Sequence, residues 1–99
     1  MKVKRITTHG NVFRHLDFSE EEAENLKIRS DLMSALIVLI KRRGLTQAQA
    51  AKLFGVSQPR VSDLTRGKID KFSVDTLIAM LGSAGVSVSV VVHNRRKVA

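Results

Sequence analysis

The sequence has no cysteine, no tryptophan and no tyrosine, and it has one proline among its 99 residues. Without cysteine the chain has no disulfide, no thiolate zinc site and no thiol nucleophile, which suits the cytoplasm. Long apolar stretches are missing too: the longest, residues 35–40, is much shorter than the roughly 20 residues that a membrane span needs. No apolar run follows the basic stretch 2–5, so we expect no secretory signal. An apolar content of 43% is nevertheless too high for a disordered chain, and the length predicts one small domain.

Patterns typical of catalysis or metal binding are also absent. The three histidines, His9, His15 and His93, are far apart and have no carboxylates at ligand spacing. The sequence contains no Ser-His-Asp arrangement, glycine-rich phosphate loop or nucleophile elbow. A solvated first helical turn explains the acidic residues 20–24, because carboxylates favour the positive end of the helix dipole. We therefore predict a protein that is not an enzyme and that has no metal ion and no cofactor.

Acidic residues are few, and basic residues dominate the charge. Seventeen lysines and arginines against nine aspartates and glutamates give a formal net charge of +8. The excess is uneven: residues 1–25 carry a net charge of −1, whereas residues 26–99 carry +9 and end in a basic tail at residues 95–97. Single lysines on a surface are ordinary, but an excess of this size indicates an acidic partner, and we favour nucleic acid.

Capping and stop signals divide the chain into helices. Ser19 and Glu22 form a capping box, which predicts a long helix over residues 20–43 with Gly44 as its stop. Whether this helix is continuous or interrupted near residues 30–31 is left open. Three shorter helices are expected, each after a Ser or Thr cap and each before a glycine: residues 47–54, 58–66 and 74–81.

The end of the chain changes its hydrophobic period. Four valines alternate with other residues and predict one β-strand: Val86, Val88, Val90 and Val92. Because a lone strand exposes unpaired backbone groups, it needs a partner, and two are open. The partner is either the same strand of a second copy, which would make the valines a dimer interface, or residues 3–7 of the same chain. The expected division is an N-terminal arm (1–18), a helical DNA-binding domain (19–84) and a strand with a basic tail (85–99).

Residues 45–67 contain two short helices joined by a turn that is too short for anything but a steep crossing. Ala51 is small where the second helix must approach, and Gly55 can adopt a left-handed turn conformation. Polar side chains of the second helix remain outward and suit contact with base edges: Gln58, Arg60, Ser62 and Asp63. The segment is therefore predicted to be a helix-turn-helix.

The same segment resembles the Xre/Cro-type helix-turn-helix of phage repressors. The resemblance covers about residues 32–82 and depends on Leu45-Thr46-Gln47, Ala50-Ala51, Leu53, Gly55-Val56-Ser57-Gln58, Val61-Ser62, Leu64 and Arg66-Gly67-Lys68. It implies a mostly α, lambda-repressor-like domain of four to five helices. The short chain, the arm at residues 11–13 and the valine strand are similar, more narrowly, to HigA-like antitoxins.

The resemblance implies a sequence-specific transcriptional regulator that binds double-stranded operator DNA as a homodimer. Its narrower form implies the antitoxin of a type II toxin–antitoxin pair, which represses its own operon and binds a ribonuclease-type toxin. Two other interpretations stay open: a stand-alone Xre-type repressor without a toxin, and a basic module that binds RNA or protein. A steep salt dependence without sequence preference would favour the basic module.

The resemblance also implies roles for single residues. Gln47 would clamp a phosphate, Ser57 would lie at the groove edge, and Gln58 would read a base, with adenine as the base that its amide fits. Arg60 and Asp63 lie where the family places base or backbone contacts. Basic residues at the ends of the motif would contact the DNA backbone: Arg43, Arg66 and Lys68.

Two residues depart from the family pattern. This sequence has Pro59 and Asp63 where several relatives carry amide side chains, so the base code of those relatives does not transfer. A carboxylate among phosphates is favourable only if it meets a cytosine amine or an arginine.

The long helix carries more apolar residues than one core stripe needs. The stripe is Leu32, Ala35, Leu36 and Leu39, and the additional residues are Met33, Ile37, Val38 and Ile40. Either the N-terminal arm packs on this additional surface, or a protein partner such as a toxin does.

Overall fold

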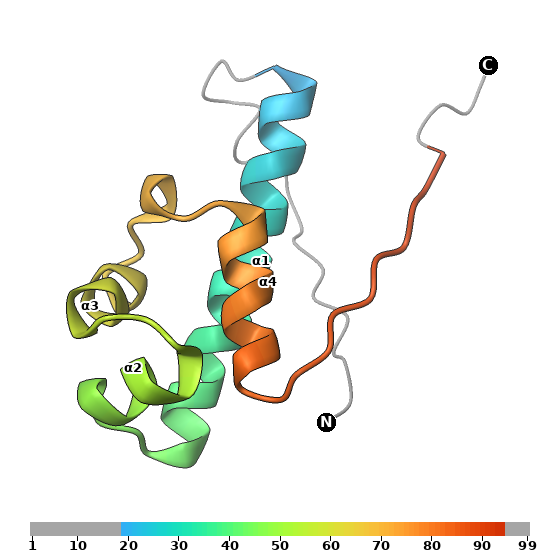
Figure 1. Cartoon of the computed structure of the whole chain (residues 1–99). Helices are drawn as coiled ribbons and strands as arrows, with labels where there is room; N and C mark the ends of the chain where they lie inside the picture. The colour runs from blue at the N-terminus through green and yellow to red at the C-terminus, as the bar shows by residue number, and fades with distance from the viewer. Residues whose placement is uncertain (1–18, 95–99) are drawn as a thin grey trace.

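The computed structural model describes residues 19–94, which form four α-helices and one short 3-10 turn (Figure 1). In chain order they are α1 (Glu20–Arg43), α2 (Gln47–Phe54), α3 (Gln58–Thr65), η2 (Ile69–Lys71) and α4 (Val74–Ser83). The predicted mostly α domain is therefore confirmed. The expected N-terminal arm and the basic tail at residues 95–97 lie outside the described residues.

Local hydrogen bonds account for the starts of the helices. At α1 the Ser19 hydroxyl accepts a hydrogen bond from the Glu22 N–H at 3.1 Å, and the Glu22 carboxylate accepts one from the Ser19 N–H at 3.0 Å. Thr46 and Gln49 make the same reciprocal pair at the start of α2. These bonds satisfy N–H groups that have no partner within the helix.

The ends of two helices differ slightly from the prediction, and a question about α1 is resolved. α1 is continuous through residues 30–31, so the interruption left open does not occur. α3 ends at Thr65, one residue early. α4 continues through Gly82 to Ser83, because Gly82 does not take a left-handed conformation there, and the chain instead turns at Gly85 with a φ of 81°.

The core lies where α1 and α4 pack side by side and where α2 and α3 lie against them (Figure 1). Each helix contributes apolar side chains to a single buried cluster: Met33, Leu36, Leu39, Ala50, Ala51, Phe54, Val61, Leu64, Phe72, Leu77, Met80, Leu81 and Ala84. No polar or charged residue is buried in the part of the chain that the structure describes. Hydrophobic burial is thus the main term that holds α3 to the rest of the domain.

Most of the additional apolar surface predicted on α1 belongs to the core. Met33 is buried, and Ile37 and Ile40 are partly buried against the core cluster. Val38 is different, with 45% of its surface exposed, and Ile28 is exposed to a similar extent. The sequence pattern overestimated the free surface because α1 packs against α3 and η2 as well as α4, which buries more than one stripe.

The predicted C-terminal strand is not found. Residues 86–94 run as an extended segment away from the helices (Figure 1), without strand pairing in the described part of the chain. Val86 and Val88 pack against the core, whereas Val90, Val91 and Val92 are exposed. The physical reason is that a ladder requires a second strand, and residues 19–94 of one chain supply only helices beside it.

Among residues 19–94, no helix combines the length and the apolar character that crossing a bilayer would require.

Candidate nucleic-acid interface

The predicted helix-turn-helix is formed by α2, the turn at residues 55–57 and α3. Ala50 and Ala51 are buried, so the backbone of α2 lies close to its neighbours. Gly55 ends α2 with a φ of 70°, and a Cβ placed there would lie 3.2 Å from the Ser83 hydroxyl at the end of α4. The left-handed conformation predicted for Gly55 is therefore confirmed, and the turn lies beside the end of α4.

The N-terminus of α3 is presented to solvent. Ser57 caps the helix by accepting a hydrogen bond from the Arg60 N–H at 3.3 Å, and Pro59 lies in the first turn, where no N–H partner is needed. Gln58 and Pro59 are exposed, whereas Val61 and Leu64 on the opposite face are fully buried. The apolar face thus anchors α3 and leaves its first turn free.

The residues predicted to contact DNA divide into two groups. Seven are exposed, and they lie at the end of α1, at the start of α2, in the first turn of α3 and just after α3: Arg43, Gln47, Ser57, Gln58, Pro59, Arg66 and Lys68. Three on α3 are partly buried: Arg60, Ser62 and Asp63.

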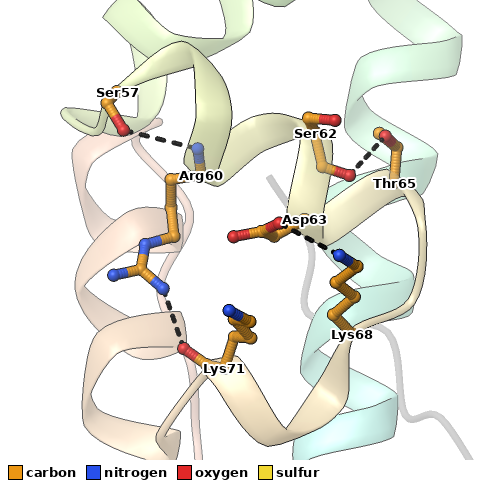
Figure 2. A network of polar contacts seen from close by, with 7 residues as sticks. All are labelled: Ser57, Arg60, Ser62, Asp63, Thr65, Lys68 and Lys71. Carbon is orange, nitrogen blue, oxygen red and sulfur yellow. Dashed lines mark hydrogen bonds and ion pairs between the residues drawn. The ribbon is translucent and has the colours of Figure 1, made fainter.

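Two of the partly buried residues, Arg60 and Asp63, contact side chains or backbone groups beyond α3 (Figure 2). The Arg60 guanidinium donates a hydrogen bond to the Lys71 carbonyl at 2.9 Å and lies 5.3 Å from the centre of the Phe72 ring. Asp63 forms an ion pair with Lys68 at 3.9 Å. The isolated carboxylate that the sequence left unexplained therefore has a cation beside it.

Sequence reasoning missed the contribution of Arg29. From α1, its guanidinium donates hydrogen bonds to the carbonyls of Ile69 at 3.1 Å and Phe72 at 3.4 Å, and to the Asn25 side chain at 2.7 Å. The two carbonyls are 40 and 43 residues away in the sequence. Because backbone carbonyls occur at every residue, no sequence pattern identifies them as the partners.

The described residues contain no group of three His, Cys, Asp or Glu side chains that could hold a metal ion. The site consists of exposed amide, hydroxyl and basic side chains around one exposed helix N-terminus. These are groups that donate hydrogen bonds to phosphates and base edges.

The family comparisons agree with this geometry. A family model described as a helix-turn-helix domain matches residues 15–93, which is most of the chain. A protein of Haemophilus influenzae described as an HTH-type transcriptional regulator is 29% identical over 90 residues, which cover 91% of each chain. A solved structure described as an XRE-family transcriptional regulator is 34% identical, with a TM-score of 0.70, over 77% of this chain and 85% of that chain.

The chain belongs to the XRE family of helix-turn-helix proteins. This XRE-family protein is a DNA-binding transcriptional regulator, and its relatives are regulators rather than enzymes.

A second solved structure similar to this XRE-family protein is described as a toxin–antitoxin module from Streptococcus pneumoniae. It is 31% identical, with a TM-score of 0.58, over 89% of this chain and 97% of that chain.

Proposed function

We propose that this chain is the antitoxin of a type II toxin–antitoxin pair and that it represses its own operon. The observation that supports the proposal is the similarity to the toxin–antitoxin module, because it covers almost the full length of both chains. The HigA-like subgroup is the narrower form of the same proposal.

DNA recognition is assigned to α3. In helix-turn-helix proteins the second helix of the motif lies in the major groove, with its N-terminal residues against base edges. Gln58 is exposed in the first turn of α3, and its side-chain amide matches the donor and acceptor pair of adenine. Ser57, Pro59 and Ser62 border the same surface.

Contacts with the sugar-phosphate backbone of DNA are assigned to exposed residues around α3. Gln47 begins α2, and α2 packs against α3. We therefore expect its amide to contact a phosphate beside the groove. Arg43, Arg66 and Lys68 are exposed cations and supply attraction that does not depend on base sequence. Asp63, paired with Lys68, contacts DNA only where that pair opens.

A homodimer completes the proposal. One recognition helix reads about half of an operator, and two half-sites one helical turn apart give specific affinity. Val90, Val91 and Val92 are exposed on the extended segment, which has no strand pairing among the described residues. We expect this segment to pair with a second copy, because an unpaired strand is a template for pairing. Pairing with residues 3–7 of the same chain is the alternative.

A stand-alone repressor is the second candidate, because the family comparisons support regulation equally well. The antitoxin and the stand-alone repressor are distinguished by expressing the adjacent reading frame alone and together with this chain. Growth arrest that this chain relieves, with a stable complex on size exclusion, supports the antitoxin. A harmless neighbour, with no complex, leaves the stand-alone repressor.

DNA recognition is tested separately by selecting bound duplexes from a random pool and comparing them with the region upstream of the gene. A selected motif that recurs as an inverted pair upstream supports autorepression. Binding of all duplexes alike contradicts a sequence-specific regulator and favours a basic module. The selected sequence is called the operator below.

A further inference from the structure

Arg60 differs from its neighbours in the first turn of α3. Gln58 and Pro59 are exposed, whereas Arg60 is partly buried and its guanidinium turns toward the loop between α3 and α4 (Figure 2). One of its N–H groups donates to the Lys71 carbonyl at 2.9 Å, and the guanidinium carbon lies over the Phe72 ring, 5.3 Å from its centre.

Both contacts are of kinds that hold an arginine in place. A hydrogen bond from a charged guanidinium is stronger than one between neutral groups, and 5.3 Å is within the range of a cation–π interaction. Phe72 has 2% of its surface exposed and belongs to the core cluster, so its ring is a fixed surface for the guanidinium.

The same loop is held from its other side by Arg29. This side chain of α1 binds the carbonyls of Ile69 and Phe72. Three carbonyls within four residues of the loop therefore accept hydrogen bonds from two arginines, one on α1 and one on α3. The loop links α3 to α1 through polar contacts, in addition to the apolar contacts of Val61 and Leu64.

We propose that Arg60 is a positioning residue for DNA recognition and not a reader of bases. Its guanidinium keeps its contacts with the Lys71 carbonyl and the Phe72 ring when DNA is bound, and it fixes the orientation in which α3 presents Gln58. The inference depends on the proposed function, in that α3 is the helix that enters the major groove.

The first test follows the Arg60 side chain by nuclear magnetic resonance in the free protein and in the operator complex. Protons near an aromatic ring are shifted by its ring current, so the Arg60 side-chain protons are expected upfield in both states. The F72L variant has no aromatic ring at this position. Disappearance of the upfield shift in free F72L would therefore show that the shift comes from the Phe72 ring. Loss of the shift when operator is added to the wild-type protein would overturn the proposal, because Arg60 would then have left Phe72.

The second test compares R60M and R60K with R66M, which removes an exposed arginine next to α3. Binding is measured on the operator and on all its single base-pair variants, at a temperature where circular dichroism shows each protein to be folded. We expect R60M to weaken operator binding by about tenfold and to lose discrimination only at the base pair that Q58A also affects, since the charged hydrogen bond and the cation–π contact that orient α3 are lost.

R60K is expected to recover part of this loss, because an ammonium group also interacts with the ring and the carbonyl. Altered preference in R60M and R60K at a base pair that Q58A leaves unchanged would assign Arg60 to base reading and would overturn the proposal. R66M is expected to leave the ring-current shift of Arg60 unchanged.

Failure of the proposed function gives a different result. A wild-type protein that binds operator and random DNA equally contradicts sequence-specific recognition, and this inference with it. A wild-type protein that prefers the operator, with an Arg60 shift that disappears on binding, contradicts this inference alone.

Discussion

Polar side chains on and around α3 divide into those that the fold uses and those that it leaves exposed. Arg60 and Arg29 bind backbone carbonyls of the loop between α3 and α4, and Asp63 pairs with Lys68. Gln58, in contrast, is exposed in the first turn of α3. Residues of similar polarity therefore differ, because some support the helix and others remain available for the DNA contacts proposed above.

Replacement of Gln58 by alanine tests the reading of a base. We expect Q58A to lose about 1–3 kcal/mol of discrimination at one operator position, which is the usual value of a bidentate contact to a base. K68A should instead weaken all duplexes alike and lower the slope of log K against log salt by about 0.9. Fluorescence anisotropy titrations across salt concentrations measure both effects. Equal losses on operator and random DNA for Q58A would contradict its assignment.

Replacement of Arg29 by methionine tests the support of the loop. R29M retains the apolar stem but removes hydrogen bonds from a charged group to two carbonyls, and it should lower the free energy of unfolding by about 1.5–3 kcal/mol. R42M, at an exposed position of the same helix, is the control and should change it by less than about 0.5 kcal/mol. Urea unfolding followed by circular dichroism measures both. A stability of R29M equal to that of R42M would show that the contacts add nothing.

At the scale of elements, the turn between α2 and α3 and the end of α4 depend on each other. α2 packs against both α3 and α4, and Gly55 places the turn next to Ser83. Gly82, one residue before Ser83, is an ordinary helical position with no heavy atom within 4 Å of an added Cβ. The two glycines therefore differ in what an added methyl group would cost.

Alanine at the two glycines should change stability in opposite directions. G55A forces an alanine into the left-handed region, which costs about 1–2 kcal/mol, and its methyl group must displace the Ser83 hydroxyl. G82A should stabilise the protein by about 0.5–1 kcal/mol, because alanine favours a helix interior. Thermal unfolding measures both changes. A stabilised G55A would mean that the turn adopts another conformation.

At the scale of the whole molecule, the C-terminal segment 86–94 joins the helical core only at its start. Val86 and Val88 pack against the core, and the chain beyond them is extended and exposes apolar side chains. In the proposed dimer this segment pairs with its copy and fixes the distance between the two copies of α3, which operator half-sites require.

Proline at Val90 tests this dimer. V90P removes a backbone donor and bends a paired strand, so we expect a monomer that retains its helical circular dichroism and loses tight operator binding. V90T retains the N–H group and the β-branched side chain, and it should remain dimeric. Analytical ultracentrifugation at micromolar concentration distinguishes the two states. A dimeric V90P would place the dimer interface elsewhere.

The amino-acid sequence by itself determined the starts of the helices and the helix-turn-helix, because caps and short turns act over three or four residues. Ser19 with Glu22, and Thr46 with Gln49, lie near each other in any helix that begins there. Only the tertiary structure decided the roles of Arg29 and Arg60, since their partners are backbone carbonyls brought close by packing. It also decided that residues 19–94 offer no partner strand to the segment 86–94, because a β-ladder depends on a neighbour that a local pattern does not specify.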